Sequence, residues 1–260
     1  MSGLTPDQLD EVVSRVAHQL EESGKPWDKG IGQRRALSLR DGVIVASAYL
    51  RQNIIEDVLA EIFGVSQPTI SRAICDLTPL VEEATAEFLP TAEDAAAAVR
   101  KRGTVLVDGF LAPCWSWHLA RDLWSGKHKT TGHNSQVITD HAGNVIYISE
   151  PMTGHNHDTT VLIETGTADI LKEAFSWIGD KGYEGHATIS PIKKPKHRDL
   201  TDNEKKFNNQ VSSLRAPVER AIANIKTWRV LHTDYRRPLK TWLTSFRAAT
   251  GLYFFKLAFE

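Results

Sequence analysis

The stretch Thr104-Val-Leu-Val-Asp108 divides this chain of 260 residues into two parts with different patterns. A β-branched, apolar run that follows Gly103 and stops at Asp108 predicts a short buried strand. The sequence before this run favours helices, and the sequence after it alternates strands with helices. A buried carboxylate without a partner is costly, so an Asp at the end of such a strand is a candidate for chemistry.

The residues after the strand predict a mixed α/β domain. Two strands joined by the turn Asp140–Asn144 form a hairpin pattern, and Asp158 is placed to cap the helix that follows. Predicted strands cover 135–139, 145–149, 177–180 and 187–192, and predicted helices cover 158–164, 168–175, 201–228 and 239–257.

The residues before the strand predict a small all-α domain. Thr5, with Pro6 and Gln8, has the pattern of a helix capping box. Further helices are predicted over 37–52, over 54–63, from Ser66 onward with an interruption at Pro79, and over 92–100 after a Thr91 cap. The predicted division is therefore a helical domain, 1–102, followed by an α/β domain, 103–260.

Residues of about 54–78 have the pattern of a helix-turn-helix. A helix that reads DNA needs short polar or cationic side chains at its N-terminal end, where it enters the major groove. The second helix offers four such candidates, Gln67, Thr69, Ser71 and Arg72, which suit base edges and phosphate oxygens. The alternative is an ordinary helical hairpin.

Composition excludes several classes of protein. A hydrophobic content of 41% excludes a disordered chain, and two cysteines exclude a disulfide framework or a zinc ribbon. No apolar run is long enough for a membrane span, so the sequence predicts a soluble, intracellular protein. The net charge of −1 has two parts. Residues 181–260 contain 16 Lys and Arg against 7 Asp and Glu, and residues 1–180 contain 15 against 25. The basic part suggests an anionic partner or, alternatively, a solvated basic face.

Three carboxylates form a candidate metal site. Asp108 and Asp180 each end a predicted strand, and Glu219 lies on a predicted helix. Carboxylate oxygens suit Mg²⁺, and two such ions about 3.5–4 Å apart can activate water and stabilise the leaving oxygen in phosphodiester cleavage. For either Asp alone a turn or cap residue is the favoured explanation, so the metal site is predicted from the three carboxylates as a set.

The helix around Glu219 adds two cations to the same face, because Arg215 and Lys226 are spaced four residues before it and seven after it. Cations beside a metal-binding carboxylate suit a phosphate backbone. The alternative is a surface stripe of ion pairs. Pro217 predicts a kink or a restart of this helix near Ala216.

At these residues the sequence resembles the DDE transposases of bacterial insertion sequences, in the group related to Harbinger-type transposases. The resemblance covers nearly the whole chain and includes the N-terminal helix-turn-helix. It is carried by the ordered segments Val105–Gly109, Ser125–Lys129, Gly154–Asp158, Gly179–Tyr183, and Phe207–Leu231 with its Arg-x3-Glu-x6-Lys spacing. One departure is Ser212, where related enzymes often carry a tyrosine that serves hairpin processing.

The resemblance implies an RNase-H-like catalytic fold in which Asp108, Asp180 and Glu219 hold two Mg²⁺ or Mn²⁺ ions. It implies a transposase that binds terminal inverted repeats, cleaves DNA and transfers strands, as a homodimer or larger assembly on transposon ends and target DNA in the bacterial cytoplasm or nucleoid. Six further residues are expected to support contacts to phosphate or DNA near the site: Arg215, Lys226, Lys181, Tyr183, Asp158 and His157. A catalytically silent DNA-binding derivative and an RNase-H-like nuclease are the alternatives.

Overall fold

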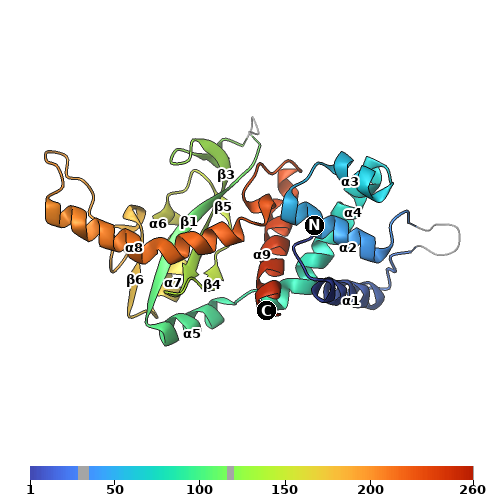
Figure 1. Ribbon diagram of the computed structural model, residues 1–260, viewed down its shortest axis with the longest axis horizontal. Coiled ribbons are helices and arrows are strands. Elements are labelled where there is room, and N and C mark those ends of the chain that lie inside the picture. Colours follow the sequence, from blue (N-terminus) through green and yellow to red (C-terminus); the bar gives the residue numbers. More distant parts are fainter. Residues whose placement is uncertain (29–34, 116–119, 260) are drawn as a thin grey trace. The chain divides into compact units, whose positions relative to one another are not determined.

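The computed structural model describes residues 1–28, 35–115 and 120–259, and the chain divides into two compact units. One unit joins Met1–Leu89 to Ile225–Glu260, and the other is Pro90–Asn224. Figure 1 shows helices alone in the first unit and a sheet with helices in the second, which confirms the mixed α/β class. Within the described ranges no helix has both the length and the apolar character that crossing a membrane requires.

The helical unit is built around a central helix, α4, which packs against α1, α2, α3 and α9. The predicted capping box of the first helix is present, because Thr5 and Gln8 bond each other's backbone N–H groups. The elements are α1 (Pro6–Glu22), α2 (Leu39–Gln52), α3 (Glu56–Phe63), α4 (Gln67–Thr85), the 3₁₀ turns η1 (Ala86–Phe88), η4 (Arg229–Leu231) and η5 (Leu239–Thr241), and α9 (Trp242–Ala258).

The interruption predicted at Pro79 is wrong, because α4 runs without a break from Gln67 to Thr85. Proline removes one intrahelical hydrogen bond, but buried residues on both sides of it, Leu77 and Val81, hold the helix in the core. The hydroxyl of Thr78 also donates to the carbonyl of Ile74 at 2.7 Å. Tertiary packing therefore outweighs the local preference.

The sheet unit has a central strand, β1 (Thr104–Pro113), paired antiparallel with β3 (Thr130–Thr139) and parallel with β6 (Ser176–Ile178). The predicted hairpin is present as β3 and β4 (Val145–Ile148). The remaining elements are α5 (Ala92–Arg102), η2 (Arg121–Leu123), β2 (Trp124–Ser125), β5 (Met152–Thr153), α6 (Asp158–Glu164), α7 (Thr167–Leu171), η3 (Lys181–Tyr183) and α8 (Asp202–Ile225).

One face of this sheet carries the core of the unit. Val105 and Val107 of β1 pack there with buried residues of α5, α6 and α7. Because side chains alternate along a strand, Asp108 points to the other face, where Arg215 of α8 reaches it. Figure 1 shows α8 passing across the sheet on the side away from α6. The fold thus brings a carboxylate on the central strand to a cation on the longest helix.

Several predicted elements differ in extent. The first strand continues five residues past Asp108 because β3 pairs with it as far as Pro113. The helix predicted over 168–175 ends at Leu171. The strand predicted over 187–192 is reduced to one bridge between Ile189 and Ile178.

The packing units also differ from the predicted division at residues 102 and 103. Helix α5 packs in the sheet unit, and Ile225–Glu260 belongs to the helical unit. The reason is that α9 is apolar around most of its circumference, with buried Phe246, Leu252 and Phe255, and a helix of that kind needs a surrounding core. The division into a DNA-binding and a catalytic domain stays a functional prediction.

Candidate active site

Asp108 occupies the middle of β1 rather than its end, and its side chain is only 15% exposed. One carboxylate oxygen accepts the backbone N–H of Gly109 at 2.9 Å. The other accepts Nη2 of Arg215 at 2.6 Å. Arg215 is itself buried, so this ion pair lies largely out of water. A charge-assisted pair of this kind fixes both side chains in place.

Burial raises the pKa of Asp108 from its ordinary value of 3.8 to about 6. The negative charge of nearby Asp180 acts in the same direction. Arg215, the Gly109 N–H group and Lys127 lower this pKa, but the net shift is upward. The influence of Asp180 on Asp108 shows that the two predicted carboxylates are electrostatic neighbours.

Asp180 follows β6 by two residues and begins the 3₁₀ turn η3. Its Oδ1 accepts the backbone N–H of Gly182 at 2.7 Å. The neighbour strand β6 is parallel to β1, so the chain leaves β6 beside the part of β1 that carries Asp108. The Nζ atom of Lys127 lies 3.7 Å from Oδ2 of Asp180.

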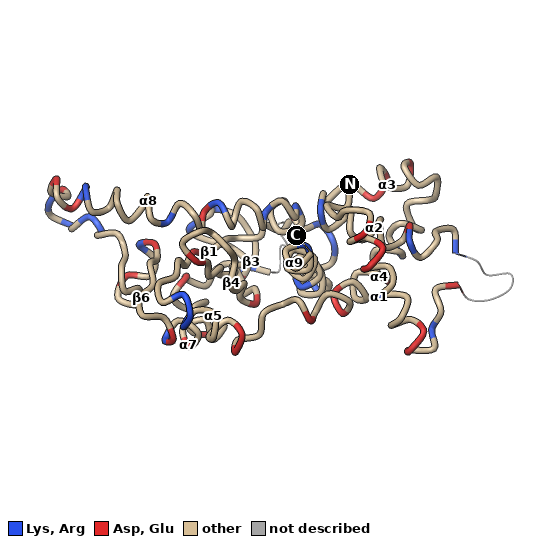
Figure 2. The backbone as a smooth tube through the Cα atoms, turned by 60° about the horizontal axis from the view of Figure 1, so that its bottom comes forward, with Lys and Arg blue, Asp and Glu red and all other residues tan. Residues whose placement is uncertain are grey.

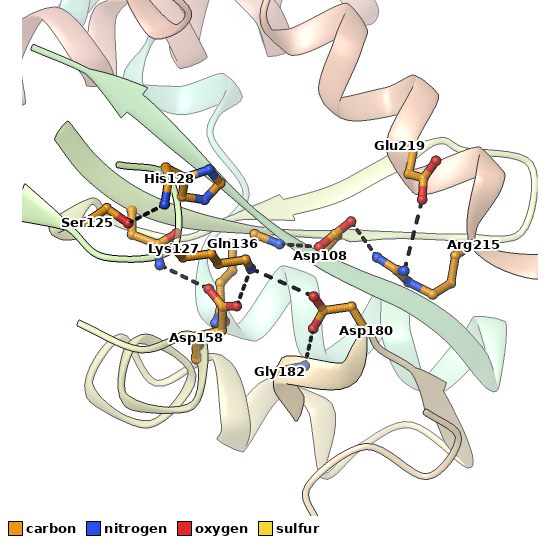
Figure 3. A network of polar contacts seen from close by, with 12 residues as sticks. Asp108, Ser125, Lys127, His128, Gln136, Asp158, Asp180, Gly182, Arg215 and Glu219 are labelled. Carbon is orange, nitrogen blue, oxygen red and sulfur yellow. Dashed lines mark hydrogen bonds and ion pairs between the residues drawn. The ribbon is translucent and has the colours of Figure 1, made fainter. Parts of the chain in front are cut away.

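Glu219 lies on α8 one turn after Arg215, and its Oε1 is 4.0 Å from Nη1 of that arginine. Arg215 therefore stands between Asp108 and Glu219, as Figure 3 shows. The expected restart of the helix at Pro217 is wrong, because α8 is continuous from Asp202 to Ile225. The side chain of Glu219 is 60% exposed, so this carboxylate borders the site from its open side.

Asp158 does not cap α6 as predicted: the N-cap residue is His157, and no side-chain cap bond is present there. The Asp158 side chain is 8% exposed and turns toward the site instead. Its oxygens accept Nζ of Lys127 at 2.6 Å and Nδ2 of Asn134 at 3.1 Å. Its backbone carbonyl accepts Nε2 of Gln136 at 2.6 Å. The hydrogen bonds of Asp158 are thus made to the sheet and to the β2–β3 turn.

Lys127 is a site residue that the sequence reasoning did not select, although it lies in one of the segments that carry the resemblance. Hydrogen bonding and charge from Asp158, with added charge from Asp180 and Asp108, raise its pKa despite burial, which acts in the other direction. The polar run Asn134-Ser-Gln136 was a usable signal for the network around Asp158, the partner of Lys127, because buried polar side chains in a strand must have partners and Asn134 and Gln136 both donate to Asp158.

Tyr183 lies beneath the site with no exposed surface, and its ring meets Trp177 edge-on at 5.6 Å between centroids. Burial and the charges of Asp158, Asp108 and Asp180 raise its pKa well above the ordinary value of 10.0. Its hydroxyl has no hydrogen-bond partner among the described residues. The Tyr183 side chain belongs to the floor of the site rather than to a surface that reaches DNA.

Three other predicted residues are not drawn into this network. The side chains of Lys181 and His157 are exposed. Lys226 follows α8 and falls in the other compact unit, so its role beside Glu219 stays a prediction. Figure 2 shows basic residues on α8 and on the segment before it. Several of these, Lys193, Lys194, Arg198 and Lys205, pair with carboxylates close to them in sequence, which reduces their share of a basic face.

The carboxylates of the site are of the right chemistry for a divalent cation. In the described part of the chain, however, no three His, Cys, Asp or Glu side chains lie close enough together to hold a metal ion as they stand. The reason is visible in the ion pairs, because Arg215 and Lys127 stand between the carboxylates. A Cβ atom on Gly182 would come within 2.8 Å of an oxygen of Asp158 and of Asp180, so only glycine leaves this space open. Clustered carboxylate oxygens are the ligands that Mg²⁺ and Mn²⁺ prefer.

The predicted DNA-reading helix is present as α4, which follows α3 after a turn at Gly64. Gly64 has a φ of 63°, a conformation that favours glycine, and it reverses the chain between the two helices. Arg72 is exposed, and its Nη2 lies 3.5 Å from Oγ1 of Thr69. Ser71 is half-buried. Gln67 donates to Glu56 of α3 and is therefore partly engaged within the unit.

Comparison with known proteins finds two family models that match different parts of this chain. Residues 107–252 match the family described as DDE superfamily endonuclease, and residues 35–86 match the helix-turn-helix of DDE superfamily endonuclease. The chain is 29% identical to a putative transposase for insertion sequence element IS112 of Streptomyces albus G, over 88% of this chain and 83% of that protein. It is 23% identical to a probable transposase for element IS702 of Microchaete diplosiphon, over 100% and 94%. No solved structure matches.

Proposed function

Because the chain belongs to the DDE superfamily of endonucleases, we propose that it cleaves the ends of its own insertion element and joins the freed strands to target DNA. A transposase of the insertion-sequence type with an N-terminal helix-turn-helix is supported by both family matches and by both curated relatives. The observation that carries the catalytic part is the network in which Arg215 joins Asp108 to Glu219 beside Asp180.

In this proposal Asp108, Asp180 and Glu219 hold two divalent cations, Mg²⁺ or Mn²⁺. Such ions, when bound, activate a water or a 3′ hydroxyl and stabilise the leaving oxygen. Asp108 is positioned by the Gly109 N–H group and by β1, and Asp180 by the Gly182 N–H group. Glu219 is the most exposed of the three, and in the proposal it turns from Arg215 toward the other two carboxylates.

The cations of the site have a second task in the proposal. Arg215 holds Asp108 in one rotamer, and its guanidinium is placed to meet a phosphate oxygen when Asp108 takes part in metal binding. The helix-turn-helix supplies recognition of the terminal inverted repeats through Thr69, Ser71 and Arg72 of α4. Two element ends must be processed together, so the working form is a homodimer or a larger assembly.

The test is cleavage of a labelled duplex that carries the inverted repeat of the element, with Mg²⁺ or Mn²⁺ and with EDTA as the blank. Asp180→Asn and Glu219→Gln are expected to abolish cleavage while leaving binding of the same duplex unchanged. The matched control is Asp169→Asn, which removes an exposed carboxylate that pairs with Lys172. Cleavage that persists in both site variants would show that these carboxylates are not the catalytic set. Binding of the repeat without cleavage in either metal would favour a silent derivative.

A further inference from the structure

A fourth carboxylate, Asp158, lies beside Asp180 in an arrangement that the DDE set does not include. Oδ2 of Asp158 and Oδ1 of Asp180 are each 2.8 Å from the point where a Cβ atom on Gly182 would stand. The two oxygens therefore face one small space, which the absence of a side chain at Gly182 keeps open. Figure 3 shows the two carboxylates turned toward each other across this space.

The Nζ atom of Lys127 bridges these carboxylates, at 2.6 Å from Asp158 and 3.7 Å from Asp180. Two acidic groups this close repel each other, and the ammonium group offsets that repulsion. The carboxylates stand at the ends of regular elements, Asp158 at the start of α6 and Asp180 at the N-cap of η3. Lys127 lies on the turn between β2 and β3 and is 52% exposed. The ammonium group of Lys127 is therefore the member of this trio that a metal ion can replace.

An unpartnered buried group lies near the other oxygen of Asp158, beside Gly109. Tyr183 has no exposed surface and its hydroxyl lacks a hydrogen-bond partner among the described residues. The hydroxyl oxygen lies 3.5 Å from the Cβ point of Gly109, and Oδ1 of Asp158 lies 3.2 Å from the same point. A buried hydroxyl normally has a hydrogen-bond partner. A water molecule bound to a hydrated cation would supply one.

We propose that Asp158 and Asp180 together hold one divalent cation, which displaces the ammonium group of Lys127. This inference rests on the proposed function, because Asp180 belongs to the catalytic set there. Mg²⁺ commonly takes one or two protein carboxylates and keeps several waters, so a pair of carboxylates is sufficient. Displaced Lys127 stays on its exposed turn, where a phosphate oxygen of DNA is its natural partner.

The competing explanation is that Asp158 serves only to hold Lys127, as a structural ion pair. The two explanations make opposite predictions for Lys127. If the ammonium group competes with a metal ion, removing it strengthens metal binding. If the pair is structural, removing the lysine leaves metal binding unchanged or weakens it.

The experiment is a titration of the full chain with Mn²⁺ in the absence of DNA, with free Mn²⁺ measured by electron paramagnetic resonance. We expect Asp158→Asn to weaken binding of one equivalent of Mn²⁺ at least tenfold, in keeping with the loss of a ligand. We expect Lys127→Gln to tighten binding three- to tenfold. Asp169→Asn is the matched control for loss of a carboxylate with a lysine partner, and it is expected to bind as the parent does.

Unchanged Mn²⁺ affinity in both Asp158→Asn and Lys127→Gln overturns the proposal. An unfolded variant cannot bind more tightly, so the result for Lys127→Gln remains decisive if Asp158→Asn is unstable. Asp180→Asn distinguishes failure of the fourth-ligand proposal for Asp158 from failure of the proposed function. If it lowers Mn²⁺ affinity and Asp158→Asn does not, only the fourth ligand is refuted. If neither it nor Asp108→Asn lowers the affinity, the metal site of the proposed function is refuted as well.

Discussion

Replacing Asp108 by asparagine is expected to stabilise the metal-free protein at pH 7, although it breaks an ion pair. Two effects compete at this residue, namely the attraction of Arg215 at 2.6 Å and the burial of a carboxylate that is only 15% exposed. Burial has the larger effect, because the pKa of Asp108 is raised from 3.8 to about 6. The folded protein therefore favours the neutral carboxyl group, which asparagine imitates.

The sign and size of this change in stability follow from the linkage between proton binding and folding. A carboxyl group whose pKa is higher in the folded state contributes stability at low pH and loses it as the pH rises through the pKa of the folded state. For Asp108 this window runs from about pH 4 to pH 6. At about 1.4 kcal/mol for each unit, the cost of the charge at pH 7 is about 3 kcal/mol, and at pH 4 it is below about 1 kcal/mol. Asp108→Asn should recover most of this cost.

The assay is amide hydrogen exchange of β1 and β3 in EDTA, which reports the free energy of opening for these strands separately from the helical unit. Asp108→Asn is expected to raise their protection factors by about a hundredfold at pH 7 and by about threefold at pH 4. Asp169→Asn, an exposed carboxylate in the same unit, should change them little. Lower protection in Asp108→Asn at pH 7 would show that the Arg215 ion pair outweighs burial and would refute the reasoning.

Further predictions concern the metal, DNA and the helical unit. Because metal ligands must be deprotonated, Mn²⁺ affinity should fall by up to about tenfold per pH unit below pH 6, as Asp108 protonates, which a titration series from pH 5 to pH 8 measures. Gly182→Ala should weaken binding of one equivalent of Mn²⁺ in the same titration, with unchanged helix content by circular dichroism, because its Cβ atom would lie 2.8 Å from two carboxylate oxygens. Arg72→Ala should weaken binding of the element end by about 1–3 kcal/mol in a gel-shift assay, and equal affinity would remove α4 from the interface. Residues 1–102 alone should show no cooperative thermal unfolding, whereas the same segment joined to 225–260 should, because α9 completes its core.

The sequence was most informative where local chemistry decides the structure. The capping box at Thr5, the cap at Thr91, the helix-turn-helix and the β3–β4 hairpin are all present, because each depends on residues a few positions apart. Asp108 and Asp180 stood out for a related reason, since a carboxylate at the end of a buried strand is costly without a partner, and Glu219 stood out through its spacing from Arg215 and Lys226.

The sequence was least informative where distant residues decide the outcome. Pro79 and Pro217 lie inside continuous helices because packing holds those helices together. The first strand passes Asp108 because β3, more than twenty residues away in sequence, pairs with it. Asp158 appeared to be a helix cap because its partner Lys127 lies on a separate turn. The return of α9 to the helical unit likewise depends on contacts with α4 that no local pattern reveals.

The central claim, that Asp180 binds a catalytic metal ion, is tested most directly by replacing it with cysteine and comparing two metals. A thiolate is a poor ligand for Mg²⁺ and a better one for Mn²⁺. Asp180→Cys should therefore fail to cleave the element end in Mg²⁺ and recover measurable cleavage in Mn²⁺, while Asp180→Ala fails in both. Equal cleavage by the cysteine variant in Mg²⁺ and Mn²⁺, or parental activity in Mg²⁺, would contradict the account.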